Sequence, residues 1–255
     1  MELNGRVVLV TGGATGIGKA TVEALARAGA SGIAINYRTA GVEAQRLADE
    51  MQRVGVKAFC VQADVKSDAQ VRAMIGQVEE HFGRLDALIN NAGVTRWVPI
   101  SDLEALTDEV WDEILDVNLK GAFRCVRAAA PLLARGQGTV VNVASISGIL
   151  ATNTMSSVAY GSAKAALIYL TRALAVALAP NVRVNAVAPA FTDTGWLRDH
   201  FGDRYEEAAA RAAGAIPLKR VAAAEEIAAA IVGLITGSDF VTGQTLVVDG
   251  GLSLA

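Results

Sequence analysis

The feature that most constrains the fold is an alternation of short apolar runs with helical patterns, repeated about seven times along the chain. The first apolar run, residues 6–10, is continuous and rich in valine, which is typical of a strand buried on both faces. Strands that alternate with helices form parallel sheets through right-handed crossovers, with helices on both faces. The sequence therefore predicts one doubly wound α/β domain spanning residues 1–255, with about seven parallel strands.

The same patterns place the individual elements. The predicted strands cover residues 6–10, 33–35, 57–61, 85–90, 139–143, 182–187 and 245–248. The predicted helices cover residues 19–27, 42–54, 68–82, 107–134, 158–178 and 225–235, with a kink at Pro131. Residues 190–224 break the rhythm, because this interval is longer than an ordinary connection. We expect it to be a substrate lid; a helical excursion that only packs on the surface or on a partner is the alternative.

Composition excludes several classes of protein. Hydrophobic residues make up 52% of the chain and charged residues 19%, which is incompatible with disorder. The net charge of −3 gives no basic excess for nucleic acid or an anionic membrane. No uninterrupted apolar run approaches about 18 residues, and the first strand starts too early for a signal peptide, so we expect a soluble cytoplasmic protein. The two cysteines and two histidines stand apart, which argues against a disulfide framework or a metal site.

A glycine-rich segment, Thr11–Gly18, follows the first strand and opens the first helix. Glycine permits the sharp turn and the close approach of a pyrophosphate to backbone amides. The helix N-terminus then offers free N–H groups and the positive end of its dipole. The spacing is G-x-x-x-G-x-G, so by itself this segment is also compatible with a turn that binds nothing.

Tyr160 and Lys164 lie four residues apart on a predicted helix, so their side chains share one face. An ammonium group beside a phenol favours the phenolate and lowers its pKa, which allows proton transfer near neutral pH. Taken alone, the pair is commonplace on exposed helices.

The motifs together resemble the short-chain dehydrogenase/reductase family across essentially the whole chain. The matching segments, in family order, are Thr11–Gly18, Asp64-Val65, Asn90–Gly93, Asn118, Ser145, Tyr160 with Lys164, Val184–Pro189 and Thr242–Gly251. The resemblance implies a Rossmann fold. It also implies transfer of a hydride between a nicotinamide cofactor and a ketone or secondary alcohol.

The resemblance also assigns roles. Tyr160 would be the general acid in reduction and the base in oxidation, and Lys164 would lower its pKa and hold the nicotinamide ribose. Ser145 would hydrogen-bond the carbonyl oxygen, and Asn118 would anchor a proton-relay water. Within the cofactor set, Asp64 would meet the adenine and Thr192 the carboxamide. That set comprises Gly12, Thr15, Gly16, Ile17, Gly18, Tyr37, Arg38, Asp64, Val65, Asn91, Ala92, Gly93, Tyr160, Lys164, Pro189 and Thr192.

Two departures from the family pattern stand near the expected substrate. The interval from Ser145 to Tyr160 is about two residues longer than usual, and Ser147 would restore the usual interval. We assign the extra length to Leu150–Ser157, which would line the substrate entrance. The family often has Pro-Gly where this chain has Pro189-Ala190, which can shift the nicotinamide site.

The end of the second strand indicates the cofactor. NAD-selective relatives usually place a carboxylate there to hold the ribose hydroxyls. This chain has Asn36-Tyr37-Arg38-Thr39 instead, and Arg38 could bind a 2′-phosphate. We predict NADP(H) over NAD(H), although Arg38 as a solvated loop charge is the alternative. The basic residue that some NADP-using relatives carry in the glycine-rich turn is absent here.

Residues 94–96, 216–220 and 242–246 look most like the 3-oxoacyl-carrier-protein reductase branch. Residues 173–181, however, carry no basic side chain for docking an acidic carrier, and Trp97 replaces a smaller polar residue. Three arginines could substitute only if they faced the right way: Arg124, Arg127 and Arg135. The expected substrate contacts are Trp97, Ser147, Phe191 and Trp196.

The sequence therefore predicts an NADPH-dependent ketone reductase, acting on a 3-oxoacyl thioester or a similar 3-oxo compound. A polyol, sugar or hydroxysteroid-type alcohol dehydrogenase is the alternative, and a non-catalytic nucleotide sensor is a third reading. The resemblance also implies a homotetramer. The alanine-rich helices at 107–134 and 158–179 and the segment 252–255 suit close symmetric packing.

Overall fold

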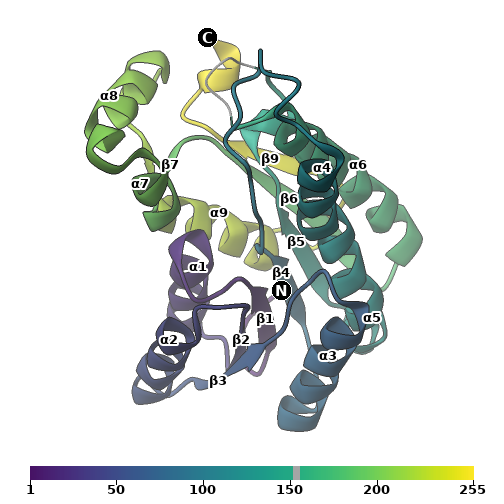
Figure 1. The fold of residues 1–255 in the computed structure, drawn as a ribbon. Coiled ribbons are helices and arrows are strands. Elements are labelled where there is room, and N and C mark those ends of the chain that lie inside the picture. Colours follow the sequence, from purple (N-terminus) through teal and green to yellow (C-terminus); the bar gives the residue numbers. More distant parts are fainter. Residues whose placement is uncertain (152–155) are drawn as a thin grey trace.

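A seven-stranded parallel sheet runs through the protein, in the order β3-β2-β1-β4-β5-β6-β9, in a computed structural model that describes residues 1–151 and 156–255 (Figure 1). The chain moves outward from β1 to β3 and then crosses back to pair β4 with β1, at Val8↔Ala87. Open α/β sheets bind ligands where the strand order reverses in this way. The strands are β1 (Val7–Thr11), β2 (Gly32–Tyr37), β3 (Lys57–Gln62), β4 (Ala87–Asn90), β5 (Thr139–Val143), β6 (Arg183–Pro189) and β9 (Thr245–Val248).

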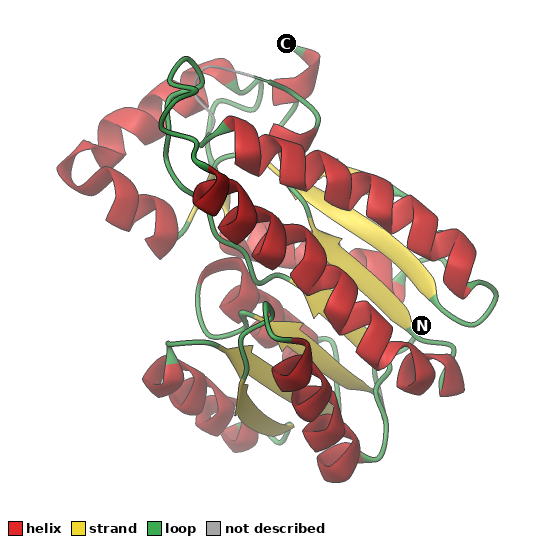
Figure 2. Ribbon diagram, turned by 45° about the vertical axis from the view of Figure 1, so that its right-hand side comes forward, coloured by secondary structure: helices red, strands yellow, loops and turns green. Residues whose placement is uncertain are grey.

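Helices cover both faces of the sheet, as Figure 2 shows. One core combines apolar side chains of α1 (Gly16–Arg27), α2 (Gly41–Arg53) and α9 (Ala224–Thr236) with one face of the sheet. A second core lies on the opposite face, beneath α3 (Asp68–Phe82), α5 (Ala122–Arg135) and α6 (Val158–Leu178). The predicted doubly wound parallel architecture is therefore confirmed, because helices cover both faces and the central strands β1, β4 and β5 are buried between them.

The predicted helix at 107–134 is divided into three parts. It consists of α4 (Asp108–Leu115), a π-helical segment (Asp116–Gly121) and α5, which continues through Pro131. π-Helical turns are rare and occur mainly at functional sites. Here the wider turn contains Asn118, one of the predicted catalytic residues. A periodic apolar pattern does not reveal such a segment, so the prediction of one α-helix was wrong at this point.

The interval 190–224 is helical rather than irregular. It contains the short strands β7 (Thr192–Asp193) and β8 (Ala222–Ala223), which pair with each other, and the helices α7 (Gly195–Phe201) and α8 (Tyr205–Ala215). Figure 1 shows α7 and α8 at the same end of the molecule as the segment that links β4 to α4. This end is the carboxyl edge of the sheet, where the predicted site residues gather.

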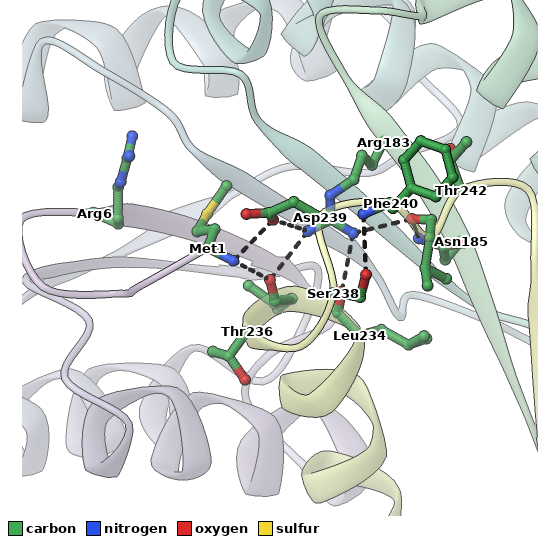
Figure 3. Close-up of polar contacts among 12 residues, drawn as sticks. Met1, Arg6, Arg183, Asn185, Leu234, Thr236, Ser238, Asp239, Phe240 and Thr242 are labelled. Atoms are coloured by element: carbon green, nitrogen blue, oxygen red, sulfur yellow. Dashed lines mark hydrogen bonds and ion pairs between the residues drawn. The ribbon is translucent and has the colours of Figure 1, made fainter.

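Helix α9 is fixed at its C-terminal end by a polar cluster shown in Figure 3. The guanidinium of Arg183 on β6 donates hydrogen bonds to the carbonyls of Leu234, Ile235 and Val241. The amino group of Met1 donates to the carbonyl of Ile235 and to Asp239. Two cations thus meet the negative end of the α9 dipole. This anchoring holds α9, and with it the C-terminal end of the 190–224 interval, against the sheet.

Within residues 1–151 and 156–255, one helix, α6, is long and apolar enough to cross a membrane by length and composition, with a mean hydropathy of 1.3. Its buried face, which includes Lys164, packs into the protein beside β6 and α4. Core helices meet the same test, so the finding carries little weight for a membrane location.

Candidate active site

The glycine-rich turn between β1 and α1 lies at the carboxyl edge of the sheet. Gly12 and Gly16 have positive φ angles of 59° and 53°, a conformation that favours glycine. A Cβ atom on Gly18 would lie 2.2 Å from the carbonyl oxygen of Gly12, so only glycine fits there. Thr15 precedes α1 without capping it through its side chain, and the first turn of α1 has no acidic residue. The helix therefore presents uncapped N–H groups and its positive dipole end, which suits a diphosphate.

Buried amide side chains hold this turn in place. The Oδ1 atom of Asn36, at the end of β2, accepts a hydrogen bond from the amide of Gly12 at 3.2 Å, and its amide group donates to two carbonyls near β3. The amide group of Asn91 donates to the carbonyls of Thr11 and Gly12 at 3.1 and 2.9 Å. Neither Asn36 nor Thr11 was predicted from the sequence to hold the glycine-rich turn. The sequence feature that marks both is a polar residue at the carboxyl end of an otherwise apolar strand.

The residues predicted to meet the adenosine half surround the ends of β2 and β3. Tyr37 packs against the backbone of Gly41, and Asp64 accepts a hydrogen bond from the amide of Lys66. Val65 is buried against Gly121 of the π-helical segment. Arg38 is exposed, and none of the ion pairs within residues 1–151 and 156–255 involves it. Its guanidinium is thus available to an anionic ligand.

The predicted catalytic residues converge at the N-terminal end of α6. Ser145 follows β5, and Tyr160 and Lys164 occupy the first two turns of α6; all three are at least nine-tenths buried. The Nζ atom of Lys164 donates to the carbonyl of Val143 at 2.7 Å and lies 5.5 Å from the centroid of the Tyr160 ring. Ser145 Oγ contacts Ser147 Oγ at 3.2 Å, so both candidate serines lie at this point.

Burial has the largest effect on the pKa values of Tyr160 and Lys164. It raises the pKa of Tyr160 to about 12, although a hydrogen bond with Ser145 opposes the rise. It also lowers the pKa of Lys164 to about 8. From the sequence, Lys164 is expected to lower the pKa of the phenol. In this structure burial acts in the opposite direction, because removing the phenolate from water raises its pKa, and the hydrogen bond of the Lys164 ammonium goes to Val143. Tyr160 is therefore held as a neutral proton donor.

Asn118 stands opposite this pair on the π-helical segment. Its amide group donates to the carbonyls of Val94 and Ile114 at 2.8 and 2.9 Å, while its buried Oδ1 atom has no partner among the described residues. A Cβ atom on Gly93 would lie 2.9 Å from that oxygen and 3.8 Å from Lys164 Nζ. Buried polar atoms without partners are rare. This oxygen is placed to accept a hydrogen bond from water or from a donor close to Lys164.

A buried polar chain fixes α6 to the sheet below the site. The amide group of Asn90 on β4 donates to Asn142 on β5 at 2.8 Å, and the amide group of Asn142 donates to Thr171 on α6 at 2.9 Å. The hydroxyl of Thr171 then donates to the carbonyl of Leu167. The bond between Asn90 and Asn142 joins β4 to β5. Neither Asn142 nor Thr171 was predicted from the sequence to take part in such a network.

Residues 190–224, the predicted lid, face this edge with polar and aromatic groups. Pro189 ends β6, and the hydroxyl of the buried Thr192 donates to the carbonyl of Ala190. The Trp196 ring lies 6.3 Å from the Tyr160 ring and 6.1 Å from Trp97, between centroids. Phe191 instead packs against Phe201 and Tyr205 within the lid, so it does not contact Tyr160 through its ring.

The predicted insertion, Leu150–Ser157, lies partly outside the described residues. Within the described part, Ser156 accepts hydrogen bonds from the Thr95 hydroxyl and the Val98 amide, both at 2.8 Å. The segment after β4 is thus tied to the start of α6. Across residues 1–151 and 156–255, no group of three His, Cys, Asp or Glu side chains is arranged to hold a metal ion.

Comparison with known proteins agrees with this geometry. Residues 12–253 match a family model described as enoyl-(acyl carrier protein) reductase. The chain is 40% identical over 251 residues to a Streptomyces violaceoruber protein named as ketoacyl reductase 2 of the granaticin polyketide synthase, covering 97% of this chain and 96% of that one. It is 36% identical to the Thermotoga maritima 3-oxoacyl-[acyl-carrier-protein] reductase FabG over 255 residues, which is 99% of each chain.

Solved structures give the same result. A gluconate 5-dehydrogenase from Burkholderia cenocepacia, in complex with NADP and tartrate, superposes with a TM-score of 0.90 at 35% identity, covering 100% of this chain and 97% of that chain. The catalytic motifs, the strand order and these relatives agree over nearly the full length. The chain is a member of the short-chain dehydrogenase/reductase family and an NAD(P)-dependent oxidoreductase.

Proposed function

We propose that this protein is an NADPH-dependent ketone reductase in which Ser145, Tyr160, Lys164 and Asn118 form the catalytic group. The observation that carries the proposal is the convergence of these four residues beside the glycine-rich turn. Tyr160 is a buried, neutral phenol next to a second hydroxyl, which is the arrangement needed to donate a proton to a carbonyl oxygen. A phenol that is protonated at neutral pH is in the form that the reductive step requires.

The residues at the carboxyl edge fit a dinucleotide. The uncapped α1 N-terminus suits the diphosphate, and Gly12 and Gly18 leave room for its close approach. Tyr37, Asp64 and Val65 would line the adenine side, while Asn91, Ala92, Gly93, Pro189 and Thr192 would line the nicotinamide side. Thr15, Gly16 and Ile17 would contact phosphate through their backbone. When bound, the nicotinamide supplies or accepts the hydride.

NADP(H) is the preferred cofactor in this proposal. Arg38 is exposed at the end of β2 without an ion-pair partner among the described residues, and β2 ends in Asn36 and Tyr37 rather than a carboxylate. The side chain of Asn36 already accepts a hydrogen bond from the amide of Gly12 in the glycine-rich turn. A guanidinium in this place forms strong charge-assisted hydrogen bonds with a 2′-phosphate.

Residues of the protein itself then transfer the proton that the carbonyl oxygen receives. The carbonyl oxygen would accept hydrogen bonds from Ser145 Oγ and the Tyr160 hydroxyl, which stabilise the negative charge that grows on it. The Tyr160 proton passes to that oxygen. The Lys164 ammonium, on the same helix face, would stabilise the phenolate that remains. A water bound to Asn118 Oδ1 would relay a proton from bulk solvent to this phenolate, so that no hydroxide is left behind. In alcohol oxidation each proton moves in the opposite direction.

The substrate we propose is a 3-oxo compound, in free form or as a thioester, not delivered by an acidic carrier protein. The three arginines considered for carrier docking are all engaged by carboxylates of the chain itself. Arg124 pairs with Asp116, Arg127 with Asp68 and Arg135 with Glu79. A polyol or sugar dehydrogenase remains the second candidate, supported by the similarity to gluconate 5-dehydrogenase. The aromatic side chains near Tyr160 favour the first.

We also propose that residues 1–255 form a single domain with a lid at 190–224 and that four copies assemble in the cytoplasm. Large apolar side chains are exposed on α6 and β9, including Tyr169, Val176 and Leu246. Such exposure suits symmetric packing between copies. Sedimentation as a monomer at micromolar concentration would contradict the assembly.

Replacing Tyr160 tests the catalytic proposal. Tyr160→Phe should reduce ketone turnover to below a few per cent while the dissociation constant for NADPH stays nearly constant. Higher residual turnover would exclude Tyr160 as the acid.

Arg38→Gln tests the cofactor preference. It should lower kcat/KM for NADPH by about tenfold and leave that for NADH unchanged, because one charge-assisted contact is lost. A wild-type preference for NADH would contradict the assignment.

A further inference from the structure

Trp196 lies beside the catalytic tyrosine and Trp97 lies beside Trp196, and no step of the reaction requires either ring. Trp97 comes from the segment between β4 and α4, and Trp196 comes from α7 in the lid. Aromatic residues make up only 5% of the chain, so their concentration here is a specific feature of the site. We call Trp97, Trp196 and His200 the aromatic clamp.

Trp196 stands between Trp97 and the catalytic phenol. Its ring is inclined by 54° to Trp97 and by 62° to Tyr160, at centroid distances of 6.1 and 6.3 Å. The side chain is nevertheless 47% exposed. An indole that touches the catalytic residue and still presents half of its surface to solvent is a contact surface for an apolar ligand.

Trp97 carries a planar ring on its face in this structure. The imidazole of His200 is stacked on the indole at a centroid distance of 3.9 Å and an angle of 12°. Burial, with a contribution from Arg204, lowers the pKa of His200 and favours its uncharged form. The stacked imidazole already covers this face of Trp97, so the exposed indole of Trp196 is the aromatic surface left for a ligand.

Trp97 and Trp196 form the two walls of the clamp, and each is held in place by its own set of contacts. On the Trp97 side, Arg96 pairs with Glu113 at 2.7 Å, and the amide of Val98 donates to Ser156. On the Trp196 side, Asp193 accepts two hydrogen bonds from Arg198 at 2.8 Å each and one from the Tyr205 hydroxyl at 2.7 Å. The walls are therefore positioned before a ligand arrives, which reduces the entropy lost on binding.

These ion pairs also define the chemistry of the clamp. The arginines that flank the tryptophans, Arg96 and Arg198, are both neutralised by carboxylates. The surfaces beside Tyr160 are thus indole faces without a free guanidinium from these neighbours. Such surfaces favour neutral, planar substrates over sugar acids or polyols, whose hydroxyls would lose hydrogen bonds to water.

We propose that the ketone substrate of this enzyme carries a planar aromatic ring system, which stacks against the exposed indole of Trp196, supported from behind by Trp97, while its carbonyl faces Tyr160. This inference rests on the proposed ketone reductase function and names the substrate class for the same site. A ring fused or joined directly to the ketone would span the distance from the clamp to the phenol.

The test compares two ketones with the same carbon skeleton, 2-tetralone, which has an aromatic ring, and 2-decalone, which is saturated. With NADPH, we expect kcat/KM for 2-tetralone to exceed that for 2-decalone by at least about tenfold, as expected for ring stacking in a desolvated site. Trp196→Leu and Trp97→Leu should reduce this ratio towards one, whereas Trp196→Phe and Trp97→Phe should keep most of it. Phe240→Leu, which removes a fully exposed ring between α9 and β9, is the matched control and should leave the ratio unchanged.

Equal kcat/KM values for the two ketones in the wild type would overturn the inference, as would leucine variants that lower both values by the same factor. Binding of 2-naphthol, followed by isothermal titration calorimetry, separates this inference from the proposed function. If the enzyme reduces no ketone but binds 2-naphthol in a manner that Trp196→Leu abolishes, the clamp stands and the ketone reductase function fails. If it reduces 2-decalone and ethyl acetoacetate readily but does not bind 2-naphthol, the reverse holds.

Discussion

The glycine-rich turn and the lid meet at the same edge of the sheet but are held in opposite ways. The turn is held by buried amide side chains, with Asn36 and Asn91 bonded directly to its backbone. The lid is held by half-exposed groups, chiefly Asp193 with Arg198 and the aromatic clamp. Gly16 of the turn faces Thr194 of the lid, so the two systems lie next to each other.

Buried hydrogen bonds and half-exposed ion pairs suit two different tasks in the protein. We call the glycine-rich turn and the buried polar side chains that tie it and α6 to the sheet the framework. Breaking a buried hydrogen bond leaves an unpaired polar group and costs about 1–3 kcal/mol, so the framework tolerates little change. An exposed ion pair contributes about 0–1 kcal/mol and can be remade in another geometry. The framework can thus hold a cofactor common to many relatives, while the lid can vary with the substrate. The following predictions test this contrast.

The largest effect is expected at Gly18. Gly18→Ala places a Cβ atom against the Gly12 carbonyl and forces the turn to shift, so the dissociation constant for NADPH should rise at least about a hundredfold. Gly76→Ala, within α3 where nothing lies within 4 Å of the new atom, is the matched control. It should leave binding unchanged and increase the free energy of unfolding by about 0.5–1 kcal/mol. Binding is measured by NADPH fluorescence, and an unchanged constant in Gly18→Ala would refute the fit of the turn.

The next effect concerns Lys164, whose pKa is lowered to about 8 by burial. Between pH 8 and the ordinary lysine value, the unfolded chain binds more protons than the folded one, so this group makes the free energy of unfolding rise with pH. The difference between wild type and Lys164→Met should increase by about 3 kcal/mol from pH 7 to pH 10.5. Tyr160 is present in both proteins, so its contribution to the pH dependence largely cancels in the difference between them. Urea unfolding at several pH values measures this difference, and a constant value would contradict the burial of a titrating lysine.

A smaller loss is expected from the polar chain below α6. Thr171→Val leaves the buried Asn142 amide without its acceptor and should lower the free energy of unfolding by about 1–3 kcal/mol. Thr236→Val is the control, because the hydroxyl of Thr236 also donates to a carbonyl four residues earlier but is exposed. It should change stability by less than about 0.5 kcal/mol. Equal losses in the two variants would remove the distinction between framework and surface.

The smallest effect on stability is expected in the lid. Asp193→Asn removes the charge that holds Arg198 and weakens the bond to Tyr205, yet should cost less than about 1 kcal/mol of unfolding free energy. Its consequence should appear as a several-fold higher KM for the ketone with an unchanged dissociation constant for NADPH. A loss of stability comparable to that in Thr171→Val would place Asp193 within the framework.

The sequence predicted most of the framework because its signals are local. Runs of valine and isoleucine marked the strands, and glycines marked the turn, since only glycine combines a positive φ with a close backbone approach. The π-helical segment around Asn118 was missed because α- and π-turns have the same apolar pattern. The lid helices α7 and α8 were missed because short helices depend on what they pack against.

The sequence by itself determined the order of the elements, the glycine-rich turn and the residue types of the catalytic group. Tertiary structure decided the properties that depend on burial. It raised rather than lowered the pKa of Tyr160, left the Oδ1 atom of Asn118 without a partner, and joined Asn90, Asn142 and Thr171 into one chain. It also brought Trp97 and Trp196 together from segments about a hundred residues apart. Period and composition describe neighbours along the chain, whereas desolvation and stacking depend on neighbours in space.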